Sequence, residues 1–209
     1  MRYGESRMGL RSVREDLEEE PMNVEDTSFP EVKILLPKKH VDERGFFSET
    51  YSRRVLAAAG IALDFVQDNQ AFSARRGTIR GLHFQVPPFA QDKIVRVIRG
   101  SIFDVVVDVR RHSPTFGRFE AFVLHGDDWK QLFIPVGFAH GLCTLEADTE
   151  IMYKVSNFYS PAHDKGVRWD DPGIGIDWPV LQEEALISPK DRALPLLSSI
   201  PNYFDASAS

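Results

Sequence analysis

A short stretch, Gly77 to Gln85, combines residue types that can carry acid–base chemistry. It contains a base, a cation and an amide in His83, Arg80 and Gln85. Because side chains alternate between the two faces of a strand, His83 and Gln85 are expected on one face and Arg80 on the other. A histidine held beside a substrate is a candidate general base, since imidazole titrates near neutral pH. The alternative is a histidine that is hydrogen-bonded in a sheet and does no chemistry.

A second histidine follows a tight turn. Pro135 to His140 has the form PxGxxH, which delivers His140 onto the next strand. Together with the stretch around His83, this motif resembles the two-part signature of cupin jelly rolls. Metal-binding cupins carry a second histidine at the position of Gln85, and they carry a glutamate further along the chain. Here residues 86–99 contain no glutamate. Two histidines and an amide are a poor ligand set for a divalent metal, so we expect no metal.

Short strands are expected to position these residues. Alternating or continuous apolar runs bounded by turn residues predict strands, and the one convincing helix runs from Ser52, a capping residue, to Gly60. Two strands joined by a turn are expected in Val32–Leu36 and in the stretch Asp42–Thr50. The other expected strands are Lys93–Ile98, Ser101–Arg110, Ala121–Leu124, Gln131–Ile134, Gly141–Leu145 and Glu150–Asn157. A hairpin is expected between Lys93–Ile98 and Ser101–Arg110, with its turn at Arg99 and Gly100. The pattern predicts an all-β protein, a jelly-roll (cupin-type) sandwich or barrel with a few short helices.

Length and charge limit the function classes. The 209 residues fit one domain, expected at 28–209, after an acidic and disordered extension at 1–27 that holds four basic and eight acidic residues. A net charge of -6 argues against nucleic-acid binding. The single Cys143 forms no internal disulfide, and no apolar run is long enough for a membrane span or a secretory signal. We therefore expect a cytoplasmic protein.

Six short motifs follow one another along the chain. They are Asp42–Phe47, Gln67–Asn69, Arg80–Gln85, Gln91–Lys93, Ile134–Gly141 and Ser188–Asp191. In this order the motifs resemble those of the dTDP-4-dehydrorhamnose 3,5-epimerase family, and the resemblance covers about residues 22 to 196. Each motif alone is weak, but their common order makes the resemblance specific.

The resemblance implies a reaction and a catalytic set. Family members act on a dTDP-4-keto-6-deoxyhexose, whose ketone acidifies the hydrogens on C3 and C5. His83 is then the base, with Asp191 as its orienting partner, and Tyr153 is the acid that reprotonates the opposite face. Lys93 stabilises the enolate oxygen, and His140 assists near that oxygen. No cofactor is implied.

Each of these residues also has a structural interpretation. Asp191 follows Ser188 by three positions and could be half of a helix capping box. Tyr153 alternates with apolar neighbours and could be core, and Lys93 could be a solvated strand end.

The resemblance also implies how the nucleotide is held. The diphosphate contacts would be Arg44, Arg80 and Lys190, since cationic side chains suit phosphate. The other substrate-binding residues would be Glu49, Gln67, Asn69 and Tyr159. The family further implies a homodimer with an exchanged N-terminal strand, through which Arg44 and Glu49 reach the neighbouring subunit's site.

Three alternatives share much of this sequence pattern. A related epimerase could invert only C3 or only C5, or act on another nucleotide sugar, with the same residues. A metal-dependent cupin oxygenase is disfavoured by Gln85. A non-catalytic sugar-binding jelly roll is disfavoured because His83, Tyr153 and Asp191 are all present.

Removing residues 1–21 is predicted to leave the protein unchanged. This acidic segment has too little apolar surface to offset its ordering entropy, and the family-like part begins at Met22. The truncated chain should keep its dimeric state, melting temperature and turnover, measured by light scattering, calorimetry and an activity assay. A monomeric or inactive truncated protein would show that this segment packs on the partner subunit.

Overall fold

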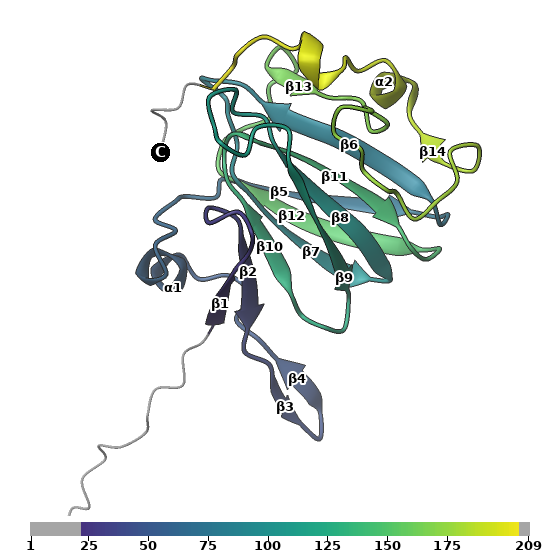
Figure 1. The fold of residues 1–209 in the computed structure, drawn as a ribbon. Coiled ribbons are helices and arrows are strands. Elements are labelled where there is room, and N and C mark those ends of the chain that lie inside the picture. The colour runs from purple at the N-terminus through teal and green to yellow at the C-terminus, as the bar shows by residue number, and fades with distance from the viewer. Residues whose placement is uncertain (1–21, 205–209) are drawn as a thin grey trace, which may run out of the picture.

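Two sheets carry most of the fold, and their strands are largely the apolar runs expected from the sequence (Figure 1). The computed structural model describes residues 22–204, and residues 1–21 and 205–209 lie outside it. The first sheet has the order β1 (Met22–Asp26), β2 (Lys33–Pro37), β10 (Gln131–Ile134), β7 (Lys93–Arg99), β12 (Thr149–Val155) and β5 (Gln67–Ser73). The second has the order β13 (Asp164–Gly166), β6 (Thr78–Gln85), β11 (Phe138–Thr144), β8 (Ser101–Asp108) and β9 (Phe119–His125), with β14 (Leu186–Ile187) beside β6.

The remaining elements are short. A hairpin of β3 (His40–Asp42) and β4 (Gly45–Phe47) projects from the sandwich (Figure 1). The helices are α1 (Arg53–Ala58), α2 (Pro189–Arg192) and the 3-10 turn Leu197–Ser199. Ser52 is the N-cap of α1 as expected, although its side chain makes no capping hydrogen bond. The predicted jelly roll with a few short helices is confirmed.

Three apolar clusters explain how the layers are held together. Buried residues of both sheets, such as Val95 and Val106, meet in the sandwich interior. The outer face of the second sheet is covered by the C-terminal segment, which contributes Trp169 and Trp178. On the outer face of the first sheet, Leu56 of α1 packs in the third cluster. In the second sheet, β8 lies between β11 and β9 and is buried on both faces.

The predicted hairpin between Lys93–Ile98 and Ser101–Arg110 is wrong. Gly100 separates two strands that belong to different sheets: β7 pairs with β10 and β12, whereas β8 pairs with β9 and β11. The residues of β8 alternate between two faces, since Val105 and Val107 face the C-terminal cover and Val106 faces the interior. Alternation defines the faces of a strand but not its partners.

The predicted extension at 1–27 reaches too far. Its last part, Met22–Asp26, forms β1 and pairs with β2 over all five residues. Apolar and polar residues alternate along β1, and Met22 is buried in the apolar cluster on the outer face of the first sheet. Residues 1–21 of the predicted extension lie outside the described residues.

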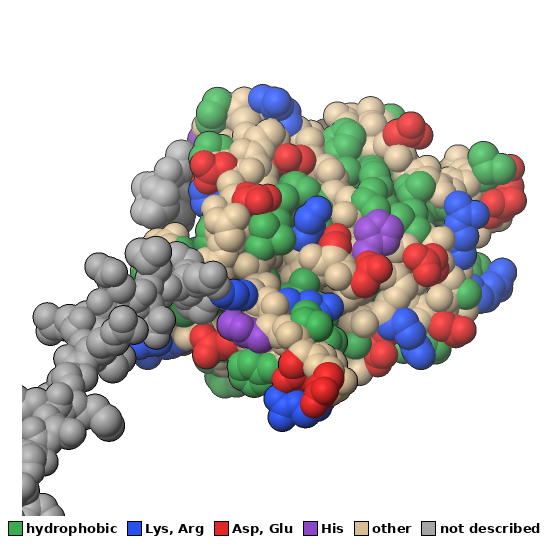
Figure 2. Space-filling model, turned by 90° about the horizontal axis from the view of Figure 1, so that it is seen from below, with side chains coloured by type: hydrophobic (Ala, Val, Ile, Leu, Met, Phe, Trp, Pro, Cys, Tyr) green, Lys and Arg blue, Asp and Glu red, His purple; other side chains and the backbone are tan. Residues whose placement is uncertain are grey.

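The surface carries no strong single-sign region on the face shown in Figure 2. Acidic and basic side chains are intermixed there, as the net charge of -6 over 209 residues leads one to expect. Between residues 22 and 204, no helix has the length and apolar character needed to cross a membrane.

Candidate active site

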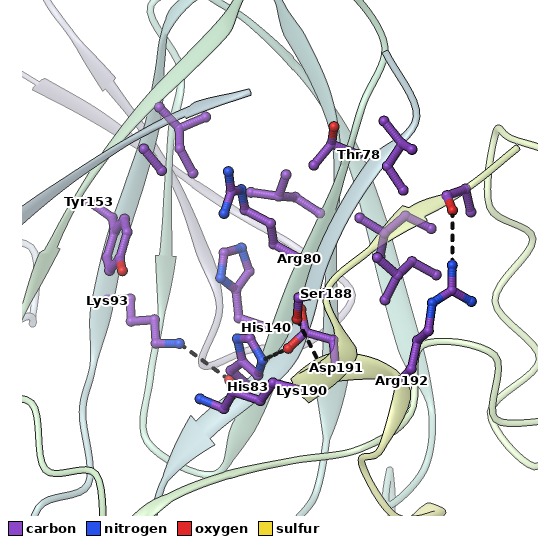
Figure 3. Close-up of a pocket in the computed structure, with 17 residues that line it drawn as sticks. Thr78, Arg80, His83, Lys93, His140, Tyr153, Ser188, Lys190, Asp191 and Arg192 are labelled. Carbon is purple, nitrogen blue, oxygen red and sulfur yellow. Dashed lines mark hydrogen bonds and ion pairs between the residues drawn. The ribbon is translucent and has the colours of Figure 1, made fainter. Parts of the chain in front are cut away.

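One end of the sandwich interior is a cavity instead of packed core. It has a volume of about 660 Å³ and receives side chains from both sheets, from β14 and from α2 (Figure 3). Seven of the twelve predicted site residues line it: Arg80, His83, Lys93, His140, Tyr153, Lys190 and Asp191. Segments that are far apart in the sequence therefore bring the predicted catalytic set together.

The edge of β6 lacks a neighbouring strand just before His83. β14 pairs with Thr78 and Ile79, and β13 pairs with residues 83–85, which leaves a gap between them. Asp191 of α2 fills this gap: its Oδ2 accepts the backbone N–H of Gly81 at 3.3 Å, and its Oδ1 contacts His83 Nε2 at 2.7 Å. The carboxylate thus replaces part of the missing ladder and orients the imidazole.

This contact defines the reactive nitrogen of His83. An ionised carboxylate only accepts hydrogen bonds, so the proton lies on Nε2 and the Nδ1 lone pair is free to act as a base. The Asp191 side chain is only 6% exposed. Burial raises the pKa of Asp191, but the hydrogen bonds from His83, Gly81 and Ser188 outweigh burial and bring that pKa below its usual value. Asp191 is therefore ionised at neutral pH.

The capping alternative for Asp191 holds only in part. Ser188 caps α2, and its Oγ accepts the backbone N–H of Asp191 at 3.1 Å. In a full capping box the acidic side chain returns to the backbone of the cap residue. The Asp191 carboxylate instead binds Gly81 and His83, so it combines the cap position with an orienting contact.

Strict alternation predicted that Arg80 and His83 lie on opposite faces of the strand, but both side chains line the same cavity. Gly81 has φ of +114°, and the pairing of β6 with β11 shifts register between His140 and Leu142. This bulge turns Arg80 and His83 into the same cavity. A side chain at position 81 would place its Cβ 2.6 Å from the backbone of Gly141, so only glycine fits there.

Arg80 also connects the two sheets. Its guanidinium donates to the Phe72 carbonyl at 3.0 Å and to Ser73 Oγ at 3.2 Å, both at the end of β5. The cation is thereby fixed beside the cavity, since two acceptors on one strand define its position.

Lys93 is a buried cation on the first sheet. Its residue is 9% exposed, and its Nζ donates to the His83 carbonyl at 3.3 Å. Burial lowers the pKa of Lys93 to about 8, while the charges of Asp164 and Asp104 oppose that shift. Lys93 is therefore mostly an ammonium ion at neutral pH, and it is not the solvated strand end of the alternative interpretation.

Tyr153 faces the cavity from β12, next to β7 in the first sheet. Burial raises the pKa of Tyr153 above its ordinary value, and the charges of Asp164 and Tyr159 add to that rise while Arg80 opposes it. The phenol therefore keeps its proton at neutral pH and can act as an acid.

His140 lies directly opposite His83 in the β6–β11 ladder. Its Nε2 contacts both carboxylate oxygens of the fully buried Asp104, at 2.9 and 3.0 Å. The second sheet thus carries two histidine–carboxylate pairs side by side.

A smaller cavity of about 280 Å³ continues from the same site. Three further predicted residues line it, together with His83, Lys93 and Tyr153: they are Gln67, Asn69 and Tyr159. Gln67 donates to Asn69 Oδ1 at 2.8 Å and accepts the backbone N–H of Tyr159 at 3.2 Å. Neutral amides and an aromatic ring in this cavity are suited to a nucleobase.

Asp164 is a site residue that the sequence analysis missed. Its Oδ2 accepts from Lys190 Nζ at 2.5 Å and from the Tyr159 hydroxyl at 3.2 Å, and it lines the smaller cavity. A lone aspartate in a polar loop carries no local signal, because only the pairing of β13 with β6 brings it to the site.

Arg44 and Glu49 are not at this cavity. Arg44 lies on the β3–β4 hairpin, where it is 85% exposed and pairs with Asp42 at 2.5 Å. Glu49 lines a separate cavity of about 200 Å³ that also contains Arg96 and Lys154. Neither side chain completes the site of its own chain.

Gln85 has a structural role that a metal ligand would not have. Its Nε2 donates to the carbonyls of Phe89 and Phe158, and its Oε1 accepts the backbone N–H of Ser160. These bonds hold the loop that carries Tyr159. No cluster of three or more metal-ligating side chains occurs within residues 22–204.

The arrangement is suited to moving protons on a carbon acid. A base, His83, projects from the second sheet, while an acid, Tyr153, and a cation, Lys93, project from the first. A substrate between the sheets can lose a proton on one side and gain one on the other, while the ammonium stabilises a developing oxyanion.

Comparison with known proteins gives consistent matches. Residues 26–199 match the family model described as dTDP-4-dehydrorhamnose 3,5-epimerase. A protein of that name from Sinorhizobium fredii is 48% identical over 183 residues, which are 88% of this chain and 93% of the relative.

Two solved structures resemble the whole sandwich. The Bacillus anthracis dTDP-4-dehydrorhamnose 3,5-epimerase with TDP and PPi bound is 49% identical, with a TM-score of 0.81 over 84% of this chain and 99% of that one. A Legionella pneumophila dTDP-6-deoxy-D-glucose-3,5-epimerase in complex with dTDP-4-keto-L-rhamnose is 42% identical, with a TM-score of 0.81 over 86% of this chain and 95% of that one.

The contribution of the ionised Asp191 carboxylate to stability should depend on pH. Asp191→Asn should lower the free energy of unfolding by about 1–3 kcal/mol at neutral pH, since it weakens a buried charged hydrogen bond. The folded-state pKa of Asp191 is depressed below 3.8, so its stabilisation is present above that pH and is lost as the pH falls through the folded pKa. The difference from wild type, measured by urea denaturation, should therefore narrow in acid.

Ser188→Ala is the matched control. It removes the cap and should cost about 1 kcal/mol. This cost should change less with pH than the cost of Asp191→Asn, because Ser188 supplies only one of the hydrogen bonds that lower the pKa of Asp191. An Asp191→Asn difference that is independent of pH would contradict an ionised contact with His83.

Proposed function

The chain belongs to the dTDP-4-dehydrorhamnose 3,5-epimerase family, and we propose that it inverts C3 and C5 of a dTDP-4-keto-6-deoxyhexose. It is an isomerase of dTDP-L-rhamnose-type nucleotide-sugar biosynthesis. The observation that carries the mechanism is the placement of His83 and Tyr153 on opposite sheets around one cavity. Inversion at carbon requires deprotonation on one face and protonation on the other.

His83 is the base in this mechanism. Its Nδ1 takes the proton from the carbon next to the ketone, and the electron pair of the C–H bond moves to the C4 oxygen as an enolate forms. Asp191, 2.7 Å from Nε2, stabilises the resulting imidazolium and preserves its orientation. Lys93 binds the enolate oxygen, where a preorganised cation in a water-poor site stabilises negative charge strongly. His140, fixed by Asp104, assists near the same oxygen.

Tyr153 is the acid. Its hydroxyl gives a proton to the opposite face of the carbon, the enolate returns to the ketone, and the phenolate then recovers a proton from water. The imidazolium of His83 loses its proton to water as well, so the cycle is balanced without a cofactor. The raised pKa of Tyr153 favours this role, because it keeps the phenol protonated before the reaction.

The nucleotide would lie beside the sugar. Arg80 and Lys190 supply cationic groups for the diphosphate. Gln67 and Asn69 present amides to the thymine, and Tyr159 offers an exposed ring to the substrate. Lys190 is paired with Asp164 at 2.5 Å, so diphosphate binding would compete with that ion pair.

We infer a homodimer that completes each site. In this arrangement the N-terminal strand is exchanged, and Arg44 and Glu49 reach the partner's cavity. Two observations support it: Arg44 lies away from the cavity of its own chain, and the hairpin that bears it exposes Phe46 and Phe47 at 53% and 71%. Exposed aromatic residues on a projecting hairpin are typical of an interface.

Deuterium exchange tests the proposed reaction. NMR of dTDP-4-keto-6-deoxyglucose with the protein in deuterated water should show deuterium entering at both C3 and C5 as the product forms. Deuterium at one carbon only would identify a single-centre epimerase. No exchange, with metal found in the purified protein by elemental analysis, would favour a cupin oxygenase instead.

Tyr153→Phe should separate exchange from inversion. The substitution removes the acid but keeps the ring, so His83 can still take and return a proton on its own face. Deuterium should enter the substrate faster than product accumulates, with both followed by NMR. Equal losses of exchange and inversion would mean that Tyr153 is not a separate acid.

A subunit-mixing experiment tests the exchanged arm. His83→Ala and Arg44→Ala homodimers should each be impaired, and heterodimers formed from them should contain one intact site. An equal mixture refolded together should regain up to about a quarter of wild-type activity, because half of the dimers are mixed and each has one good site of two. Absence of regain, with mixed dimers verified by mass spectrometry, would place Arg44 at its own subunit's site.

A further inference from the structure

Lys93 carries a buried ammonium that has no negatively charged group among its direct contacts in the part of the chain that the structure describes. Its ammonium is buried and donates to a single backbone carbonyl, that of His83, at 3.3 Å. It forms no ion pair with any residue between 22 and 204. A buried ammonium without a counter-charge tends to lose its proton, because burial favours the neutral amine.

Asp164 provides a carboxylate in the same space. It lines the 280 Å³ cavity together with Lys93, and its side chain is 12% exposed. Both of its side-chain hydrogen bonds, from Lys190 Nζ and the Tyr159 hydroxyl, use Oδ2. Oδ1 has no hydrogen bond to the described part of the chain. The pairing of β13 with β6 fixes the aspartate near His83, whose carbonyl binds Lys93.

We propose that the Asp164 carboxylate is the counter-charge that keeps Lys93 in its ammonium form, which makes Asp164 a positioning residue for the reaction. This inference rests on the proposed function, in which the ammonium stabilises the enolate. Asp164 takes no proton from the substrate in this role. It acts through Lys93, by holding the charge on that side chain before the substrate enters.

The direction of the pKa shifts agrees with the geometry. Burial lowers the pKa of Lys93 to about 8, and Asp164 is the stronger of the two carboxylates that oppose this, ahead of Asp104. Asp104 is itself engaged by His140 through both oxygens. The other titratable or charged groups around Lys93 are His83 and Arg80 on β6, His140 on β11, Tyr153 on β12, Tyr159 before β13, and Lys190, Asp191 and Arg192 on α2.

Removing this carboxylate should therefore lower the pKa of Lys93. The loss of an opposite charge within the cavity predicts a fall of about one unit. Less of the enzyme would then carry the ammonium at neutral pH, and the missing activity should return as the pH is lowered.

A direct titration of Lys93 tests the inference. The probe is the ¹³Cε NMR signal of Lys93 in uniformly lysine-labelled protein, assigned by its absence in Lys93→Arg. Asp164→Asn should move the titration midpoint down by about one unit. The matched control, Lys190→Met, breaks the same ion pair but leaves the Asp164 charge in place, so the midpoint should stay or rise. An unchanged midpoint in Asp164→Asn would overturn the inference.

The pH dependence of kcat/KM gives the second reading. In Asp164→Asn, kcat/KM should begin to fall at a lower alkaline pH than in wild type, by the same amount as the Lys93 midpoint moves. Asp164→Glu should return this fall to the wild-type pH. A loss of equal size at every pH would mean that Asp164 acts as a direct substrate contact or a structural residue, and would also overturn the inference. If Asp164→Asn does not fold, Asp164→Ser serves as the uncharged variant, with circular dichroism as the check.

The two readings separate this inference from the proposed function. The NMR titration needs no substrate, so it reports on Asp164 and Lys93 even if the chain does not epimerise the substrate tested.

Discussion

The hydrogen bond between His83 Nε2 and the Asp191 carboxylate, 2.7 Å long and spanning 108 residues of sequence, is the contact on which the site depends. It forms because β6 is left without a partner strand between β14 and β13. A buried strand edge must satisfy its backbone groups, and Asp191 does so at Gly81 while it also orients the imidazole. The local bulge at Gly81 then brings Arg80 to the same side. One short helix at the end of the chain thus organises the base, its tautomer and a neighbouring cation.

The sandwich interior is divided between stability and chemistry. One part is closed by apolar residues of both sheets, including Val95, Val106 and Leu132, and this burial is the main source of stability. The other part stays open and carries polar groups, including two histidine–carboxylate pairs: His83 with Asp191 and His140 with Asp104. Lys93 forms no direct ion pair within residues 22–204, and its counter-charge acts across the cavity. A cation held in this way is available to an oxyanion, whereas a direct ion pair would have to break first.

Much of this site could be predicted from residue types, and the failures have identifiable causes. The family motifs selected His83, Lys93, Tyr153 and Asp191, and all four line the cavity. Arg80 was put on the wrong face because a bulge adds one residue to the strand, which a strict period of two cannot include. The supposed hairpin at Gly100 failed because a turn between two strands does not show that they pair. Asp164 was missed because strand pairing, and no nearby motif, brings it to the cavity.

The central claim is that one histidine serves both carbons. The most direct test is deuterium exchange by His83→Ala, measured by NMR at C3 and C5 of dTDP-4-keto-6-deoxyglucose, with dTDP binding measured by calorimetry as the check on the rest of the site. The account predicts that exchange stops at both carbons while dTDP still binds, because the base is lost and the diphosphate contacts are not. Exchange that stops at one carbon and continues at the other would show that a second base is at work and would contradict the account.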